Sequence, residues 1–230
     1  GFYDLPVFLD NTKEILRCLK GLSKNDLKDI WKCNDKIVDE NIDRLKKMNL
    51  ERDLTPAVLA YEGIAYKYMA PSVFEDNQFS YVQEHLRILS AFYGVLKPMD
   101  GVRPYRLEMQ AKLRVNSNKD LYAYWGDKLY KSIVDESHVI INLASKEYSK
   151  CIEKYLNEDD RYITITFCEL ANGKLVTKGT YAKMARGEMV RYMAENNISD
   201  VEGIKSFNRL GYVYRDDLSS DDEYVFERIH

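Results

Sequence analysis

The sequence predicts a mixed α+β fold, a mixed sheet flanked by helices, in a single domain over residues 1–230. Two observations predict it. The first third of the chain carries apolar residues at helical spacing, whereas from residue 139 onward strand-like runs alternate with helical ones. No internal repeat and no linker rich in proline, glycine or serine divides the chain, which is long enough to bury a proper core.

Helical periodicity and capping residues predict the elements of the first 137 residues. Ser23 and Asn34 are of the type that caps a helix, Gly21 is a stop signal, and Pro56 suits a first helical position. Apolar residues that recur every three or four positions extend these helices. We expect helices at residues 8–19, 23–31, 34–48, 79–93 and 120–137, a further helix that starts at Thr55-Pro56, and a short extended piece at residues 95–98, after Gly94.

Strands and helices alternate in the rest of the chain. The pair Asn172-Gly173 predicts a tight turn, so residues 174–178 should run antiparallel to the strand before them. Ser145 is expected to cap a helix that runs towards residue 156, and a capping box at residues 199–202 should open a short one. The expected strands lie at residues 139–143, 161–170, 212–214 and 224–226, and the longest helix lies at residues 180–196.

The composition limits the functions that are possible. Hydrophobic residues make up 45% and charged residues 31%, with a net charge of −3, which excludes a polybasic, histone-like protein and disfavours disorder. No apolar run is long enough to cross a membrane, and we expect no secretory leader. Four scattered cysteines indicate reduced thiols rather than disulfides or a zinc site. We therefore expect a cytoplasmic protein without membrane contact, cofactor or dedicated metal site.

Residues 97–114 form the first segment that could carry chemistry. They hold five cations, Arg103 and Arg106 among them, against two carboxylates. Arg106 and Glu108 stand two residues apart, so in an extended chain both side chains point to the same face. One reading is an internal ion pair that holds a loop. The other is an arginine that grips a phosphate or carboxylate and is oriented by Glu108.

The second segment is the end of the strand at residues 139–143. There the chain runs through Asn142 to Ser145, where a helix is expected to begin. Backbone N–H groups at a helix start, with a hydroxyl beside them, form an anion site. Plain capping of the helix by Ser145 is the alternative.

The third segment is the helix from Tyr181 onward. Lys183, Arg186 and Arg191 share one broad side of it, with Gly187 among them. A glycine inside a helix costs about 1 kcal/mol relative to alanine, which predicts a close approach to the backbone there. The face is either a solvated basic surface or a binding surface for phosphate groups or nucleic acid.

Long motifs follow one another in a fixed order along the chain. They are Leu86-Arg-Ile-Leu-Ser-Ala-Phe-Tyr-Gly-Val-Leu-Lys-Pro-Met-Asp100, Pro104-Tyr-Arg-Leu-Glu-Met109, Trp125-Gly-Asp127, Ile141-Asn-Leu-Ala-Ser145 with Glu147-Tyr148, Lys183-Met-Ala-Arg-Gly187 with Arg191-Tyr192, Phe207-Asn208, Gly211-Tyr212 and Val225-Phe226-x-Arg228. With these motifs the chain resembles the YaaA family, bacterial proteins associated with the peroxide stress response. The family pattern opens with a strand and loop of the type I-S-P-A-K, and this chain has no such segment, so we expect that strand to be absent.

The resemblance implies a YaaA-type mixed fold and a cytoplasmic role in limiting oxidative damage by holding down free iron. It also implies DNA binding through an element like a helix-hairpin-helix. Only residues 86–96 could form that element here, with Tyr93-Gly94-Val95 as its hairpin.

Three hypotheses for function follow. The first is a stress protein that binds DNA through the hairpin near Gly94 and the basic faces, with the contact residues Arg103, Arg106, Asn142, Ser145, Lys183, Arg186 and Arg191. The alternative is an enzyme for a phosphorylated or nucleotide-like small molecule, in a cleft lined by Arg106, Glu108, Asn142, Ser145, Lys183 and Arg186, with Glu108 or Tyr181 as the acid–base group. The third is direct iron binding by carboxylates and tyrosines, which the shortage of histidine and paired cysteine disfavours.

Overall fold

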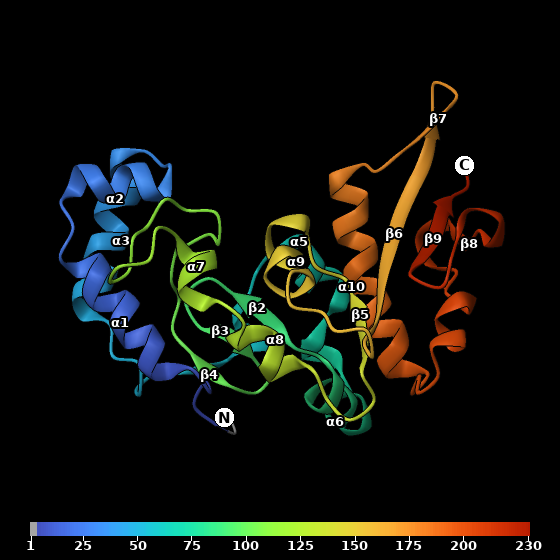
Figure 1. Ribbon diagram of the computed structural model, residues 1–230, viewed down its shortest axis with the longest axis horizontal. Helices are drawn as coiled ribbons and strands as arrows, with labels where there is room; N and C mark the ends of the chain where they lie inside the picture. The colour runs from blue at the N-terminus through green and yellow to red at the C-terminus, as the bar shows by residue number, and fades with distance from the viewer. Residues whose placement is uncertain (1–3) are drawn as a thin grey trace. The chain divides into compact units, whose positions relative to one another are not determined.

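The computed structural model describes residues 4–230, in which helices flank a mixed sheet, as the fold class predicts (Figure 1). The chain divides into two compact units. Unit 1 comprises residues 4–60, 87–133 and 144–156, and unit 2 comprises residues 61–86, 134–143 and 157–230. The assignment of the whole chain to a single domain stays a prediction.

The first three helices of unit 1 confirm the capping signals. The Ser23 hydroxyl accepts the Asp26 N–H at 3.1 Å, and the Asn34 side chain accepts the Ile37 N–H at 3.0 Å. Each cap satisfies a backbone donor that the helix itself leaves without a partner. The helices are α1 (Leu9–Lys20), α2 (Lys24–Trp31) and α3 (Asp35–Lys47).

The long helix expected at residues 79–93 is wrong. Helix α6 (Asp76–His85) ends early, and the chain continues as the strands β2 (Ile88–Ser90) and β3 (Gly94–Leu96), which pair antiparallel. Gly94 has φ of +80°, a conformation that allows the chain to turn back and that L side chains rarely adopt. Residues 86–96 therefore form a β-hairpin and not a helix-hairpin-helix.

Two further expectations in unit 1 are corrected. Thr55–Pro56 is a two-residue strand, β1, that pairs with β4 (Gly101–Val102), and α4 (Ala57–Ala60) begins only after the proline. Residues 120–137 form two short helices rather than one, because Gly126, with φ of +52°, ends the first. The two helices are α7 (Leu121–Trp125) and α8 (Lys128–Ile133), and α9 (Lys146–Glu153) completes the unit.

Unit 2 is built on a sheet with the strand order β5-β6-β9-β8. The long strand β6 pairs in parallel with β5 and β9, and β8 pairs antiparallel with β9. Beyond the predicted turn at Asn172-Gly173, β7 pairs antiparallel with the end of β6. The strands are β5 (Val139–Asn142), β6 (Arg161–Ala171), β7 (Lys174–Val176), β8 (Tyr212–Tyr214) and β9 (Glu223–Arg228).

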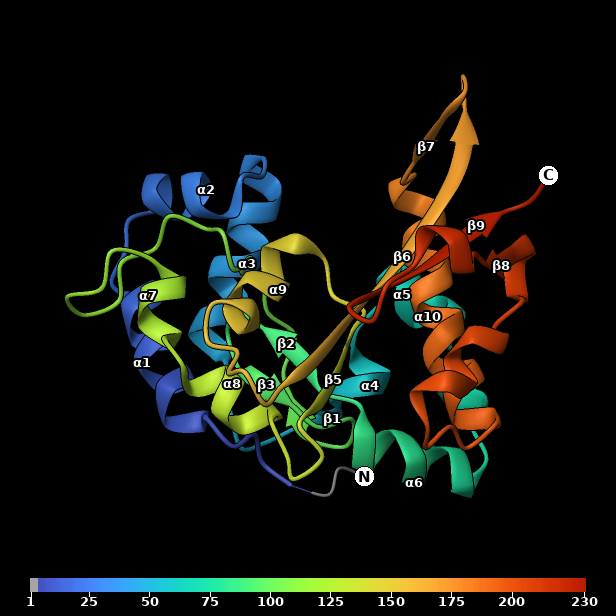
Figure 2. The same cartoon turned by 45° about the vertical axis from the view of Figure 1, so that its right-hand side comes forward.

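Helix α10 (Gly179–Glu195) packs on one face of this sheet and buries the core of unit 2. Alternation along β6 sends Ile163, Ile165 and Phe167 to that face, where they meet Ala185 and Met189 of the helix. Helix α5 (Ile64–Met69) and α6 pack against α10, as Figure 2 shows. The remaining elements are short 3-10 turns at Pro71–Val73, Val201–Ser206, Arg209–Gly211 and Asp216–Leu218.

The capping box at residues 199–202 is partly wrong. The side chain that caps the turn is Asp200, which accepts the Glu202 N–H at 2.9 Å, and the element that follows is a 3-10 turn.

A pH-dependent stability is expected from Asp100 in unit 1. Burial raises the pKa of its carboxyl to about 6 from 3.8, although Lys97 N–H donates to it at 2.8 Å. The folded protein then keeps a proton that the unfolded chain releases, so stability from this group is present below pH 4 and lost as pH rises through about 6. Urea unfolding of wild type and Asp100→Asn should show this loss between pH 4 and 7 only in the wild type. Parallel pH profiles would contradict the assignment.

Candidate anion-binding surfaces

The two arginines of the first segment are held by backbone carbonyls of unit 1. Arg106 donates through Nε and Nη2 to the Trp31 carbonyl at 3.2 and 3.1 Å. Arg103 donates to the Asp53 carbonyl at 3.3 Å. Glu108 is exposed and makes no ion pair within residues 4–230. The internal Arg106–Glu108 pair is therefore not formed, and the guanidinium of Arg106 is positioned by α2 instead.

The start of α9 lies beside the loop that carries Arg106 and Glu108. Gln110 N–H donates to the Glu147 carboxylate at 3.3 Å, which ties the loop to the first turn of the helix. Ser145 is the N-cap residue, but its exposed hydroxyl does not accept a capping hydrogen bond. The first segment is thus tied to the first turn of α9, two residues beyond Ser145. Asn142 belongs to unit 2, where its side-chain amide donates to Thr164 Oγ1 at 3.3 Å.

Helix α5 accounts for the close approach expected at Gly187. A Cβ atom there would lie 1.9 Å from the Ala65 carbonyl oxygen and 2.9 Å from the Met69 nitrogen. The missing side chain therefore lets two helices of unit 2 touch through their backbones. No ligand is needed to explain this glycine.

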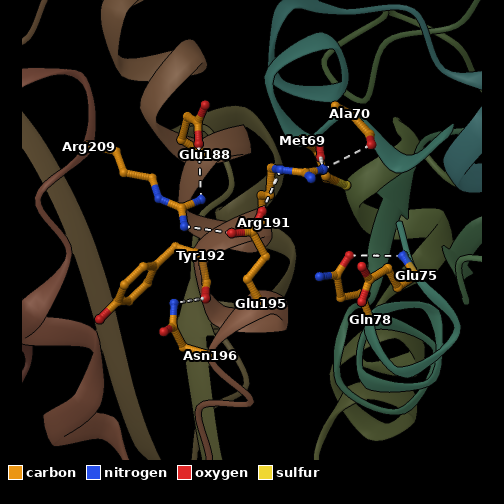
Figure 3. A network of polar contacts seen from close by, with 10 residues as sticks. All are labelled: Met69, Ala70, Glu75, Gln78, Glu188, Arg191, Tyr192, Glu195, Asn196 and Arg209. Atoms are coloured by element: carbon orange, nitrogen blue, oxygen red, sulfur yellow. Dashed lines mark hydrogen bonds and ion pairs between the residues drawn. The ribbon is translucent and has the colours of Figure 1, made fainter. Parts of the chain in front are cut away.

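Arg191 is part of the structure of unit 2 rather than of a free basic face. Its Nη1 donates to the carbonyls of Met69 and Ala70 at 3.2 and 3.1 Å, where α5 ends (Figure 3). Its Nε pairs with the Glu195 carboxylate at 2.6 Å, and Arg209 binds Glu195 as well. The carbonyls at a helix end lack hydrogen-bond partners within the helix, and Arg191 donates to two of them.

Lys183 and Arg186 are the cations of α10 that remain available. Lys183 is exposed and Arg186 is half-buried, and neither makes an ion pair or hydrogen bond within residues 4–230. Burial lowers the pKa of the Arg186 guanidinium, because removal from water disfavours its charge. A nearby anion would remove that penalty, so this pair is the part of the predicted site that best fits an anionic ligand.

Tyr181 takes part in a cluster that sequence reasoning missed. The guanidinium of Arg228 lies 3.9 Å from the centre of the Tyr181 ring, and its Nη1 is 3.9 Å from Glu169 Oε1. Glu169 is buried and also binds His230 at 2.9 Å and Lys178 at 3.5 Å. Burial alone would raise the pKa of this carboxyl, but His230 and Lys178 outweigh burial and lower it. The only sequence signal was a glutamate inside an apolar strand.

Gly94 lies in the core of unit 1 and offers no surface. A Cβ atom there would lie 2.9 Å from the Trp125 ring and 3.0 Å from the Phe8 ring. The neighbouring Tyr93 and Val95 are also buried. Gly94 is therefore not exposed at the place where this hairpin was predicted to contact DNA.

Three further findings concern metals, thiols and membranes. Within the described part of the chain, no three His, Cys, Asp or Glu side chains gather as a metal site would require. Burial raises the pKa of the Cys151 thiol to about 12 and also raises that of Cys168, the cysteine predicted to lie in the core. No helix in residues 4–230 has the length and apolar character to span a membrane.

These features define an α+β protein with a sheet covered by a helix that carries two available cations. The chain belongs to the family of peroxide stress protein YaaA, whose family model matches residues 3–218. A UPF0246 protein of Agathobacter rectalis is 69% identical over 225 residues, which cover 98% of this chain and 90% of the relative. UPF0246 proteins of Lachnoclostridium phytofermentans and Desulfitobacterium hafniense are 54% and 52% identical, over 96% and 97% of this chain and 87% and 89% of theirs.

Proposed function

We propose that this protein acts in the cytoplasm during peroxide stress, limits iron-driven damage, and binds DNA through the Lys183 and Arg186 side of α10. The observation that carries the DNA-binding part is the pair itself, two cations without a partner among residues 4–230. Family membership supports the stress role. Gly94 and Arg191 leave the proposed contact set, because one is buried and the other holds the end of α5.

The pair suits phosphate recognition for two physical reasons. Lys183 precedes Arg186 by three positions, so the two side chains are neighbours on the helix surface. A cation that meets a phosphate displaces condensed counterions, which makes binding to DNA fall steeply as salt rises. Gly187 fixes the helix against α5 and so holds the pair in place.

Fluorescence anisotropy with a labelled DNA duplex between 50 and 200 mM salt tests the proposal. Wild type should bind, with an affinity that falls steeply with salt. In Lys183→Gln/Arg186→Gln the slope of log affinity against log salt should shrink by roughly two units, at about 0.9 per lost phosphate contact. The control variant Lys36→Gln/Lys46→Gln removes two exposed cations of α3 and should behave like wild type. Salt-independent binding would contradict the proposal.

A second candidate function rests on the start of α9. Ser145, whose hydroxyl makes no capping hydrogen bond, stands at the start of this helix, and the loop that carries Arg106 and Glu108 is tied to the first helical turn. This arrangement could hold the phosphate of a small molecule for an enzyme. Thermal-shift measurements with inorganic phosphate, ribose 5-phosphate and adenosine monophosphate test it. Stabilisation should occur in wild type and be weaker in Ser145→Ala, which lacks the hydroxyl, and in Arg106→Gln, which lacks the positive charge. Equal stabilisation of the variants would exclude this site.

A further inference from the structure

We propose that the β6–β7 hairpin, the ribbon formed by residues 169–176, is an arm that binds duplex DNA together with the start of α10. Lys174, Lys178 and Lys183 are its phosphate contacts. The inference rests on the proposed function. It adds the β6–β7 hairpin as a second DNA-binding element and specifies duplex DNA as the partner. Both ribbon views show the hairpin projecting from the end of the sheet of unit 2 (Figures 1 and 2).

Charge is concentrated on this part of the chain. Residues 170–187 hold Lys174, Lys178, Lys183 and Arg186 and no aspartate or glutamate, although the whole chain has a net charge of −3. The three lysines are exposed. The charged side chains of this stretch are therefore all positive, as binding to a polyanion requires.

The nearest carboxylate does not cancel this charge. Lys178 lies 3.5 Å from Glu169, but the Glu169 side chain is only 3% exposed, whereas that of Lys178 is 52% exposed. Glu169 also faces His230 and Arg228. Lys178 is thus not the sole partner of this buried carboxylate, and its half-exposed side chain remains accessible to a phosphate.

Strand register places the ribbon lysine on the side of α10. Side chains alternate along β6, so Glu169 and Ala171 point to the same face as Phe167, which packs against α10. Lys174 is the cross-strand partner of Ala171 and shares that face. Leu170 and its partner Leu175 point the other way. Lys174 therefore lies on the same side of the sheet as α10, the helix that carries Lys183 and Arg186.

Shape and composition favour duplex over single-stranded DNA. A two-stranded ribbon fits the major groove of B-DNA, which is about 12 Å wide, with lysines reaching the phosphates at its edges. Proteins that bind single strands stack bases on exposed aromatic rings. Residues 170–180 contain no aromatic residue, and the ring of Tyr181 is covered by the guanidinium of Arg228. The arm can therefore bind the phosphate backbone of DNA, but it offers no exposed aromatic ring on which a base could stack.

Anisotropy with duplex and single-stranded DNA of the same length tests the inference, with vesicles of anionic lipid as a third arm. Lys174→Gln/Lys178→Gln should bind duplex more weakly, with a salt slope smaller by roughly two units. Leu170→Ser/Leu175→Ser changes the opposite face and should leave duplex binding unchanged. Far-UV circular dichroism should show the wild-type fold in both variants, since all four positions are exposed.

The outcomes separate this inference from the proposed function. If wild type binds no duplex, the proposed function fails, and the arm with it. If wild type binds and Lys183→Gln/Arg186→Gln weakens binding, but Lys174→Gln/Lys178→Gln does not, only the arm is overturned. Equal affinity for single strands, or binding to the vesicles but not to DNA, overturns the assignment of duplex DNA as the partner.

Discussion

Gly187→Ala should destabilise unit 2 by about 3 kcal/mol or more. Alanine in a helix interior is normally better than glycine by about 1 kcal/mol, so propensity alone would predict a gain. The added methyl would sit 1.9 Å from the Ala65 carbonyl oxygen and 2.8 Å from its carbon, and both are backbone atoms that cannot rotate away. Overpacking in a core costs typically 1–3 kcal/mol, and more where backbones must separate. Urea unfolding followed by circular dichroism measures the loss.

Gly179→Ala is the matched control on the same helix. A Cβ atom at Gly179 meets nothing within 4 Å, and the residue begins α10. The variant should be as stable as wild type or slightly more stable. A Gly187→Ala protein with wild-type stability would show that α5 and α10 do not touch as described.

Gly94→Ala should destabilise unit 1 by two effects that add. With φ of +80°, the backbone is in the left-handed region, which disfavours alanine by roughly 1–2 kcal/mol. The methyl would also lie 2.9 Å from Trp125 Cζ3 and 3.0 Å from Phe8 Cδ2. The Trp125 ring cannot swing into solvent, because it is buried and its Nε1 donates to the Ala91 carbonyl at 3.0 Å. The overlap adds a further 1–3 kcal/mol, approximately.

Gly173→Ala separates the two effects. Gly173 has φ of +76°, but a methyl group added there would meet no atom within 4 Å, so only the backbone penalty applies. Its loss of stability should be smaller than that of Gly94→Ala, with both measured by urea unfolding. Equal losses would mean that the Trp125 and Phe8 rings move aside freely.

Local signals predicted much of the fold because they act over a few residues. Ser23 and Asn34 cap helices through hydrogen bonds to backbone N–H groups only three residues further along the chain. Asn172 and Gly173 adopt the positive φ values that a tight hairpin needs, +52° and +76°. Strand β6 was predicted almost to its ends because alternation and β-branched residues agree there. None of these signals depends on what packs against the element from elsewhere in the chain.

One helix was predicted at residues 79–93 because the apolar residues there recur at helical spacing. Such a short run is also compatible with a pair of strands. Leu86, Leu89 and Phe92 recur every three residues, yet Ile88–Ser90 forms hydrogen bonds with Gly94–Leu96 instead. Short apolar runs do not distinguish helix from strand, and tertiary packing decides. Trp125, far along the chain, fills the space beside Gly94 and favours the turn.

The candidate site was predicted in residue type but not in role. The helical face with Lys183, Arg186 and Arg191 exists, but a sequence does not show that Arg191 reaches the carbonyls of Met69 and Ala70, more than a hundred positions earlier. The close approach at Gly187 was predicted, but the sequence does not show that helix α5 makes it. Long-range backbone contacts leave no local pattern, so both roles required the structure.

Strand β6 also limits where residues can be inserted into this chain or deleted from it. One uninterrupted strand, Arg161–Ala171, holds β5, β9 and β7 in register along its course. Deletion or insertion of one residue within it would reverse which side chains face α10 and misalign those partners at once. At Asn172-Gly173 the same change would alter only the exposed turn. Variation in length among relatives should therefore collect at this turn and spare the strand before it.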